Sequence, residues 1–178
     1  MKSKYLFCLI LIFIIGCNQQ KEKQIQATGV AEMKLTSSEF SNNGVIPSEY
    51  TCDGSNINPQ LSISDVPSNA KSLALTMDDP DAPVGVWDHW VVFNIPISTK
   101  EIAKGKEPQG TAGRNSGGRS GYVGPCPPSG THRYFFKLYA LDTTLNLPDG
   151  STKKDLEKAM QGHIVAQVQL MGTYKRSR

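Results

Sequence analysis

Apolar and polar residues alternate with a period of two in five segments of this chain, and the same segments are rich in β-branched and aromatic residues. Such alternation predicts β-strands that bury one face. Clusters of Gly, Pro, Asn, Asp and Ser separate the segments and are typical of turns. The strands are expected at residues 32–40, 71–77, 87–95, 134–141 and 163–174.

A single helix is predicted late in the chain. Ser151 or Thr152 can cap its N-terminus, apolar residues follow at helical spacing, and Gly162 marks its end. One helix among several strands and long loops predicts a mostly β fold. We expect an antiparallel two-sheet β-sandwich, with the short helix in the C-terminal half and a last strand that returns into a sheet.

The first 16 residues have the pattern of a lipoprotein signal peptide. Lys2 and Lys4 precede an unbroken apolar run over residues 5–15, which is too short for a membrane-spanning helix of about 20 residues. The run leads into Gly16 and Cys17 as in a bacterial lipobox, so lipidation is expected at Cys17. The alternative is a signal peptide cleaved elsewhere, with Cys17 incidental.

The residues after the signal peptide are polar and weakly patterned, which predicts a flexible tether over residues 17–31 and a folded domain over residues 32–178. Acyl chains contribute about 0.8 kcal/mol per buried CH₂, so a multiply acylated Cys17 would hold the domain at a membrane. We therefore expect a lipid-anchored protein of the bacterial cell envelope, with its domain on the extracytoplasmic side.

The size and charge of the chain limit its partners. With 178 residues and 38% hydrophobic content, the chain fits one domain with a substantial core. Its formal net charge of +3 falls to +1 when Lys2 and Lys4 leave with the signal peptide. This near-neutral balance, without a basic stripe among aromatic residues, argues against a nucleic-acid partner.

The cysteines divide into two groups. Cys8 lies in the signal peptide and Cys17 at the lipidation site, which leaves Cys52 and Cys126 in the domain. An oxidising compartment favours a disulfide between these two residues. Two unpaired buried thiols are the alternative.

Two proline-rich segments each lead into a histidine. Residues 79–83, Asp-Pro-Asp-Ala-Pro, precede His89, and residues 124–128, Gly-Pro-Cys-Pro-Pro, precede His132. Proline fixes φ and removes a backbone donor, so both segments are predicted to be rigid loops. Rigid loops lose little entropy when a ligand binds, which makes them suitable walls for a preorganised site.

The side chain of the first histidine is expected on an apolar face. Alternation along its strand places Trp87, His89 and Val91 on one face and Trp90 and Val92 on the other. A single histidine on such a face is commonly a satisfied core residue. A second histidine that opens a strand directly after the other proline loop favours a site shared by the two.

The polar residues around the two loops suit an oxyanion. His89, His132 and Tyr134 supply hydrogen-bond donors, while Asp79 and Asp81 can orient the imidazoles and hold them charged. Charge-assisted hydrogen bonds to a phosphate or carboxylate contribute roughly 1.5–3 kcal/mol each. The alternative for the two aspartates is a turn role, in which they bond their own backbone.

Several ordered motifs resemble the signature segments of the phosphatidylethanolamine-binding protein family, and its bacterial Raf-kinase-inhibitor-like branch fits best. The resemblance runs from about residue 35 to residue 174 and implies an antiparallel two-sheet sandwich with a small pocket for phosphate-like head groups, no catalytic role, no metal and no cofactor. The motifs are residues 79–83, Trp87-x-His89-Trp90, residues 122–128 and His132-Arg133-Tyr134.

The resemblance also implies which residues form the pocket and what it binds. The expected partner is a small phosphate-like anion or a phospholipid head group. The implied ligand-binding residues are Asp79, Asp81, Pro83, His89, His132 and Tyr134, with the backbone of Gly124 to Cys126 at the rim.

Two other functions use the same residues. A protein-interaction module that inhibits a protease or a kinase, as some members of the family do, could present the exposed loops. A hydrolase could use Cys126 and His132 as a thiol–imidazole pair, or His89, His132, Asp79 and Asp81 as metal ligands. No HxH or HExxH spacing favours a metal, and a Cys126 in a disulfide is not a nucleophile.

Overall fold

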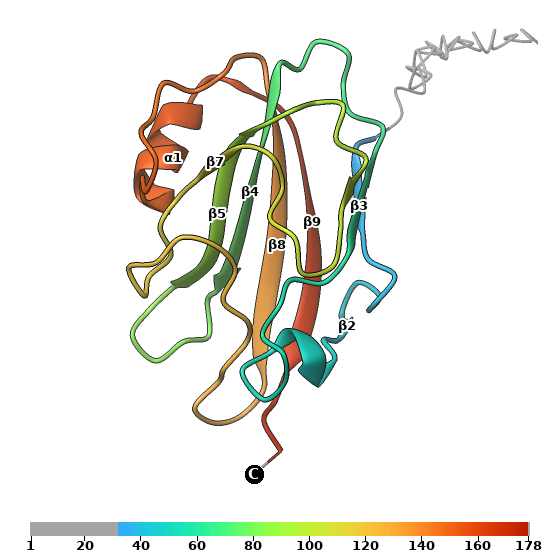
Figure 1. Ribbon diagram of the computed structural model, residues 1–178, viewed down its shortest axis with the longest axis vertical. Helices are drawn as coiled ribbons and strands as arrows, with labels where there is room; N and C mark the ends of the chain where they lie inside the picture. Colours follow the sequence, from blue (N-terminus) through green and yellow to red (C-terminus); the bar gives the residue numbers. More distant parts are fainter. Residues whose placement is uncertain (1–31, 178) are drawn as a thin grey trace, which may run out of the picture. The chain divides into compact units, whose positions relative to one another are not determined.

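The computed structural model describes residues 32–177 (Figure 1). The predicted signal peptide, Cys17 and the tether over residues 17–31 lie outside these residues. The fold described below belongs to residues 32–177. In residues 32–177, no helix is long and apolar enough to cross a membrane.

Nine strands of the described chain form two sheets. The small sheet has the order β1-β3-β6 and the large sheet has the order β2-β9-β8-β4-β5-β7. Neighbouring strands are antiparallel except β2 and β9, which are parallel. The strands are β1 (Lys34–Thr36), β2 (Gly44–Val45), β3 (Leu61–Ser64), β4 (Ser72–Asp79), β5 (Trp87–Ile95), β6 (Glu101–Ile102), β7 (Thr111–Ala112), β8 (His132–Leu141) and β9 (Ile164–Tyr174).

The predicted fold class is confirmed: the described chain is mostly β, with two sheets and one short α-helix. Each of the five predicted segments overlaps a strand, and the bounds of β5 agree at both ends. The strands β2, β3, β6 and β7 were not predicted, because two to four residues are too few to establish an alternation. A 3-10 turn, η1 (Ser48–Tyr50), was also not predicted.

The predicted helix is α1 (Lys153–Met160). Of the two possible caps, Thr152 is the one observed: its hydroxyl accepts a hydrogen bond from the Asp155 N–H, and the Asp155 carboxylate accepts one from the Thr152 N–H. This reciprocal arrangement is a capping box, and it fixes the point where the helix begins.

One face of the large sheet packs against the small sheet. The core between them includes the large side chains of Leu75, Trp90 and Phe136 from the large sheet. The small sheet contributes Leu61 and Ile63 of β3, which are both buried. These two residues alternate with more exposed polar residues along β3, which is the pattern expected of a strand with one covered face.

The other face of the large sheet packs against α1. Val91 and Phe93 of β5 and Leu156 of α1 belong to this second core. In Figure 1, α1 lies beside β5 at one side of the view and β3 lies at the other. Because β4 lies between the two cores, every one of its residues is buried.

β5 contains a bulge at His89. Met77 of β4 pairs with Trp90, but the next residue of β4, Asp78, pairs with Asp88, so His89 has no partner residue on β4. An extra residue of this kind disrupts the alternation of side chains along its strand. The bulge therefore decides which way the histidine points.

The predicted grouping of His89 with Val91 on one face of β5 is wrong because of this bulge. His89 contacts the ring of Tyr134 on the side of the sheet that also carries Trp90 and Val92, whereas Val91 faces α1. His89 thus shares its side with Trp90 and not with Val91. Strict alternation could not predict this, since a single inserted residue leaves no mark in the hydrophobic pattern.

Candidate functional site

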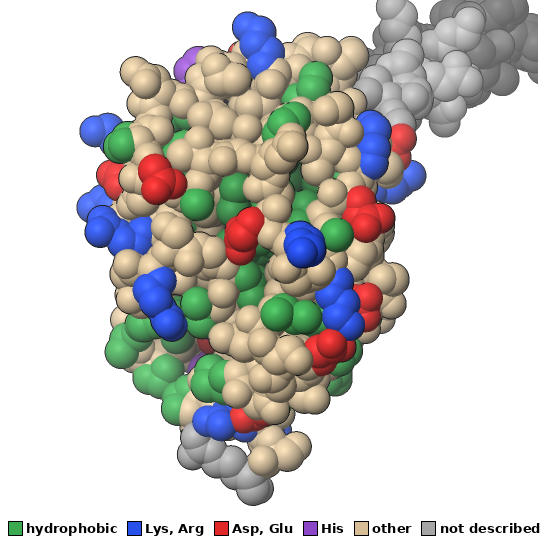
Figure 2. Space-filling model, in the orientation of Figure 1, with side chains coloured by type: hydrophobic (Ala, Val, Ile, Leu, Met, Phe, Trp, Pro, Cys, Tyr) green, Lys and Arg blue, Asp and Glu red, His purple; other side chains and the backbone are tan. Residues whose placement is uncertain are grey.

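A cavity of about 270 Å³ lies where β4 ends and where β5 and β8 begin. Both proline-rich segments contribute to its walls, as predicted from the sequence. Figure 2 shows hydrophobic side chains gathered over the loop between β4 and β5, beside this end of the molecule. The cavity is lined by Asp79, Ala82, Pro83, Val84, Trp87, His89, Val123, Gly124, Cys126, Pro128 and His132.

His132 is held by a carboxylate. Its Nδ1 lies 2.7 Å from Oδ2 of Asp79, and both side chains are buried. Because a carboxylate only accepts hydrogen bonds, Nδ1 of His132 carries the proton. The other Asp79 oxygen accepts a hydrogen bond of 2.8 Å from the Asp81 N–H, so Asp79 both shapes the loop and orients the imidazole.

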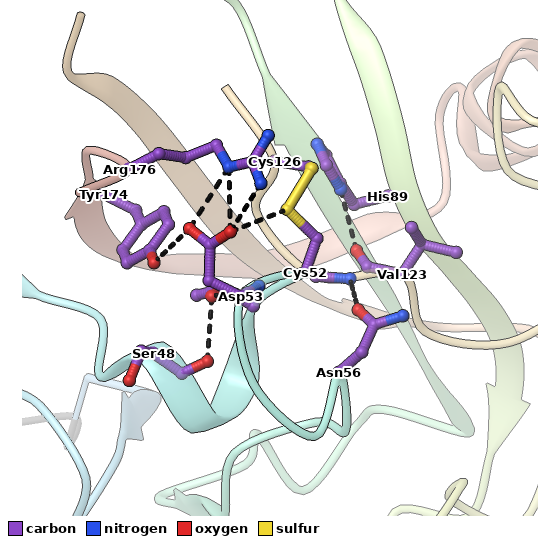
Figure 3. The surroundings of a disulfide bond; sticks show 11 residues. Ser48, Cys52, Asp53, Asn56, His89, Val123, Cys126, Tyr174 and Arg176 are labelled. Atoms are coloured by element: carbon purple, nitrogen blue, oxygen red, sulfur yellow. Dashed lines mark hydrogen bonds and ion pairs between the residues drawn. A yellow bond between two sulfur atoms is a disulfide. The ribbon is translucent and has the colours of Figure 1, made fainter. Parts of the chain in front are cut away.

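His89 is held by a backbone carbonyl. Its Nδ1 lies 2.7 Å from the oxygen of Val123, so this nitrogen also carries a proton (Figure 3). Burial lowers the pKa of His89 below its ordinary value, although nearby acids including Asp79 act in the opposite direction. At neutral pH, His89 is therefore a neutral imidazole with its Nε2 unprotonated.

Tyr134 packs against both imidazoles, although it is not among the residues that line the cavity. Its ring meets His89 edge-on at a centroid distance of 5.3 Å and is stacked with His132 at 6.5 Å. Its hydroxyl is buried and forms no hydrogen bond of ordinary geometry with a described residue, although Asp79 and the Cys126 backbone lie nearby. Burial and the Asp79 charge raise the pKa of Tyr134, so the hydroxyl keeps its proton.

Asp81 is also not part of the cavity wall. Its carboxylate accepts hydrogen bonds from the Arg133 guanidinium at 2.9 and 2.7 Å, and from the Arg133 N–H at 2.9 Å. The side-chain bonds from Arg133 are the main reason that the pKa of Asp81 falls to about 2. The structure therefore gives Asp81 a role in fixing the loop rather than in lining the site.

A disulfide joins Cys52 to Cys126 beside the cavity (Figure 3). Further bonds connect the same two segments: the Cys52 N–H donates to the Pro125 carbonyl, and the Gly124 N–H donates to Oδ1 of Asn56. A side chain at Gly124 would overlap the backbone of Tyr50 and Thr51, directly before Cys52. The cavity rim is thus packed tightly onto the loop that carries Cys52.

The end of β9 supports the same loop. The Tyr174 hydroxyl donates a hydrogen bond of 2.8 Å to Asp53, and the Arg176 guanidinium donates one of 2.6 Å to the same carboxylate. Figure 3 shows these side chains next to Cys52. The loop that carries the disulfide is therefore fixed from two sides.

A second hollow, of about 470 Å³, lies over β8 and β9. Its lining includes Glu32, Lys137 and Tyr139 but no predicted site residue. Although this hollow is larger, the histidines, the aspartate and the proline loops that the sequence singled out meet at the smaller cavity. The smaller cavity is therefore the candidate site.

The hydrolase alternatives find no support in this geometry. Cys126 lies in a disulfide, so it offers no thiolate for a pair with His132. Within residues 32–177, no group of three or more His, Cys, Asp or Glu side chains has an arrangement that could hold a metal ion.

Several lining residues were not predicted, among them Val84, Trp87 and Val123. Val123 was not recognisable because it acts through its carbonyl, and any residue type has one. Trp87 stood in a quoted motif and was expected on the same face as His89, but it was not named as a site residue. Val84 follows the first proline loop directly, so its position in the chain was the available signal.

Comparison with known proteins identifies the family of this chain. Residues 36–175 match the sequence model of the phosphatidylethanolamine-binding proteins. The chain belongs to this family. A relative from Methanothermobacter thermautotrophicus, a UPF0098 protein, is 53% identical over 150 residues, which cover 81% of this chain and 99% of the relative.

Solved structures of the phosphatidylethanolamine-binding protein family share the fold. A homologue from Chlamydia trachomatis has a TM-score of 0.80 and 46% identity, covering 82% of this chain and 99% of that one. YbcL from E. coli, described as a member of the mammalian family, has a TM-score of 0.77 and 32% identity, covering 83% and 100%. The predicted family is therefore confirmed.

Proposed function

We propose that the cavity binds a phosphate-like anion, either a small phosphorylated molecule or a phospholipid head group, and that it does so without catalysis. The observation that carries the proposal is the matched arrangement of His89 and His132. Each imidazole has its Nδ1 bonded to an acceptor, and each lines the cavity with no described partner at Nε2.

Proton uptake connects this arrangement to anions. A neutral imidazole whose Nδ1 carries the proton has only a lone pair at Nε2, which does not attract an anion. Protonation turns Nε2 into a charged donor, and the buried Asp79 carboxylate beside His132 is a partner for the resulting positive charge. Anion binding should therefore be coupled to protonation of the imidazoles.

The surroundings of the two histidines favour the same ligand. The ring of Tyr134 packs against both imidazoles, and its protonated hydroxyl is the neutral donor that we assign to the anion. Apolar walls from Pro83, Val84 and Trp87 reduce the competition from water, which strengthens hydrogen bonds to a charged group. Val84 is 79% exposed at the mouth, where it could contact the apolar part of an amphiphilic ligand.

Calorimetry with inorganic phosphate and phosphoethanolamine tests the proposal. Because burial lowers the pKa of His89, its imidazole gains a proton only below neutral pH, so affinity should rise as the pH falls from about 8 to about 5.5. His89→Ala and His132→Ala should each weaken binding, whereas His163→Ala is the control, since His163 pairs with Asp142 outside the cavity. Affinity that is independent of pH, or equal in all three variants, would contradict the proposal.

The location of the protein forms a second part of the proposal. We infer from Lys2, Lys4 and the lipobox that the exported chain begins at a lipidated Cys17 and stays at the membrane of a bacterial envelope. Membrane fractionation with mass spectrometry of the N-terminus tests this. Identical behaviour of Cys17→Ser would contradict it.

A further inference from the structure

Two acidic side chains lie opposite each other on the face of the large sheet that is turned toward α1. Asp78 of β4 pairs in register with Asp88 of β5. The Oδ1 atoms of both are buried and form no hydrogen bond of ordinary geometry with a described residue. Like charges directly opposite on neighbouring strands destabilise their pairing. These strands therefore need a compensating positive charge at this point.

Lys153 supplies that charge. Its Nζ lies 3.7 Å from Oδ1 of Asp78 and 3.2 Å from Oδ1 of Asp88, and its side chain is only 10% exposed. Burial by itself would lower the pKa of Lys153, but Asp78 and Asp88 more than reverse this and raise it above its ordinary value. The ammonium is therefore charged at neutral pH and bridges the two strands.

Two further charged groups complete the cluster. Lys137 lies 3.0 Å from the other oxygen of Asp78, and Glu157 lies 3.5 Å from Lys153 at the exposed side. Lys137 contacts Asp78 but has no ion pair with Asp88. Among the described residues, Lys153 is the cation that is paired with both acids.

The position of Lys153 is set from outside the two strands. It is the first residue of α1, directly after the Thr152 cap. The carbonyl of the residue before the cap, Ser151, accepts a hydrogen bond of 2.9 Å from the Arg114 N–H. The helix α1 thus places the Lys153 ammonium against the large sheet, although Lys153 lies far from Asp78 and Asp88 in the sequence.

The cluster lies directly behind the candidate site. Asp78 is followed by Asp79, and Asp88 is followed by the bulge residue His89. Successive residues of a strand point to opposite faces, so the carboxylates that Lys153 bridges and the two cavity residues share the same short stretch of backbone. A change in the distance between β4 and β5 at Asp78 and Asp88 must therefore also move Asp79 and His89.

We propose that Lys153 is a positioning residue of the cavity: by bridging Asp78 and Asp88, it fixes His89 relative to the Asp79–His132 pair. The inference rests on the anion-binding function proposed above. Without the ammonium, the carboxylates of Asp78 and Asp88 would face and repel each other. This repulsion would separate the ends of β4 and β5 and increase the distance between the imidazoles of His89 and His132.

The test is whether removing a second charge restores the phosphate affinity of a Lys153 variant, as measured by calorimetry. Lys153→Met should weaken phosphate binding by about fivefold, the equivalent of one unfavourable charge pair. Adding Asp88→Asn removes the repulsion and should restore the affinity of the folded protein. Lys154→Met, at the exposed neighbouring position, is the matched control and should bind as the wild type does.

A purely structural role predicts a different result. It would lower the thermal stability of Lys153→Met but leave the affinity per folded molecule unchanged, which would overturn the proposal. If Lys153→Met does not fold, the double variant with Asp88→Asn decides: it should fold and bind like the wild type. A double variant that folds but still binds about fivefold more weakly than the wild type would also overturn it.

NMR signals of the His89 and His132 rings, recorded without an anion, separate this inference from the proposed function. They should shift in Lys153→Met and return in the double variant. If they do so while the wild type binds no phosphate, the anion-binding function fails and the positioning role stands. If the wild type binds phosphate but these signals do not move in Lys153→Met, the positioning role fails alone.

Discussion

On the α1 side of β4 and β5, Asp78 and Asp88 form ion pairs with lysines. One residue further along each strand, on the cavity side, Asp79 is hydrogen-bonded to His132, and His89 is hydrogen-bonded to the Val123 carbonyl. The first face has opposite charges within the protein for each of its acids. On the second face, His89 and His132 line the cavity and are hydrogen-bonded through Nδ1, with no described partner at Nε2, and the buried Tyr134 hydroxyl also has no hydrogen bond to a described residue.

The difference indicates that neighbouring residues of the same strand have different roles: Asp78 and Asp88 stabilise the fold, whereas Asp79 and His89 belong to the candidate binding site. Buried polar groups without partners cost free energy, so proteins seldom contain them unless water or a ligand completes the network. Ion pairs that are complete within the chain need no ligand. Buried atoms on the α1 face, such as the Thr76 hydroxyl, also lack a hydrogen bond, but on the other face His89 and His132 line a cavity that a ligand can enter. The cavity face is therefore the one that we expect to bind a ligand, and substitutions on the two faces should affect different measurements.

The largest expected effect is on the disulfide that supports the cavity face. Replacing Cys52 and Cys126 by Ala removes a cross-link between residues 74 positions apart, which should lower the free energy of unfolding by roughly 4 kcal/mol. Phosphate affinity should fall as well, because the rim at Gly124 and Cys126 loses its anchor. Denaturant unfolding and calorimetry measure the two effects. Two titratable thiols in the denatured, unreduced domain that lacks Cys8 and Cys17 would contradict the disulfide itself.

On the α1 face, a core substitution should reduce stability alone. Met160→Ala removes a buried side chain at the opposite end of α1 from Lys153, and we expect a loss of about 3 kcal/mol. Phosphate affinity per folded molecule should stay at the wild-type value, because Met160 belongs neither to the cavity lining nor to the charge cluster around Lys153. A matching loss of affinity would show that the two faces are not separable in this way.

The sequence predicted the strands and most of the cavity residues, but not the pairing of Asp78 with Asp88 or the bulge at His89. β5 was located at both ends because its hydrophobic pattern is strong, whereas the predicted β4 stopped at residue 77, before the two acids that occupy its end. Asp78 and Asp88 were missed because acids are unusual in strands and their partner, Lys153, lies far away in the chain. The bulge at His89 likewise depends on tertiary contacts, as does the Arg133 bond that turns Asp81 away from the cavity.

A smaller effect distinguishes two buried hydroxyls, one on each face. Tyr134→Phe should weaken phosphate binding by at least about tenfold, the contribution of one hydrogen bond to a charged group, with little change in stability. Thr76→Val is the matched control on the α1 face, where the Thr76 hydroxyl also lacks a hydrogen bond of ordinary geometry. It should leave affinity unchanged. Equal binding by both variants would mean that Tyr134 does not donate to the anion.

The smallest effect is expected at Asp81, which holds its loop without lining the cavity. The Arg133 bonds lower the pKa of Asp81 from 3.8 to about 2, so this pair stabilises the folded state above about pH 4 and loses its contribution as the pH falls toward 2. Because Arg133 is half exposed, the contribution should stay below about 1 kcal/mol. Urea unfolding of Asp81→Asn should therefore differ from the wild type at about pH 5 and converge with it near pH 2, with phosphate affinity unchanged. A stability difference that stays constant over this range would show that ionisation of Asp81 is not its cause.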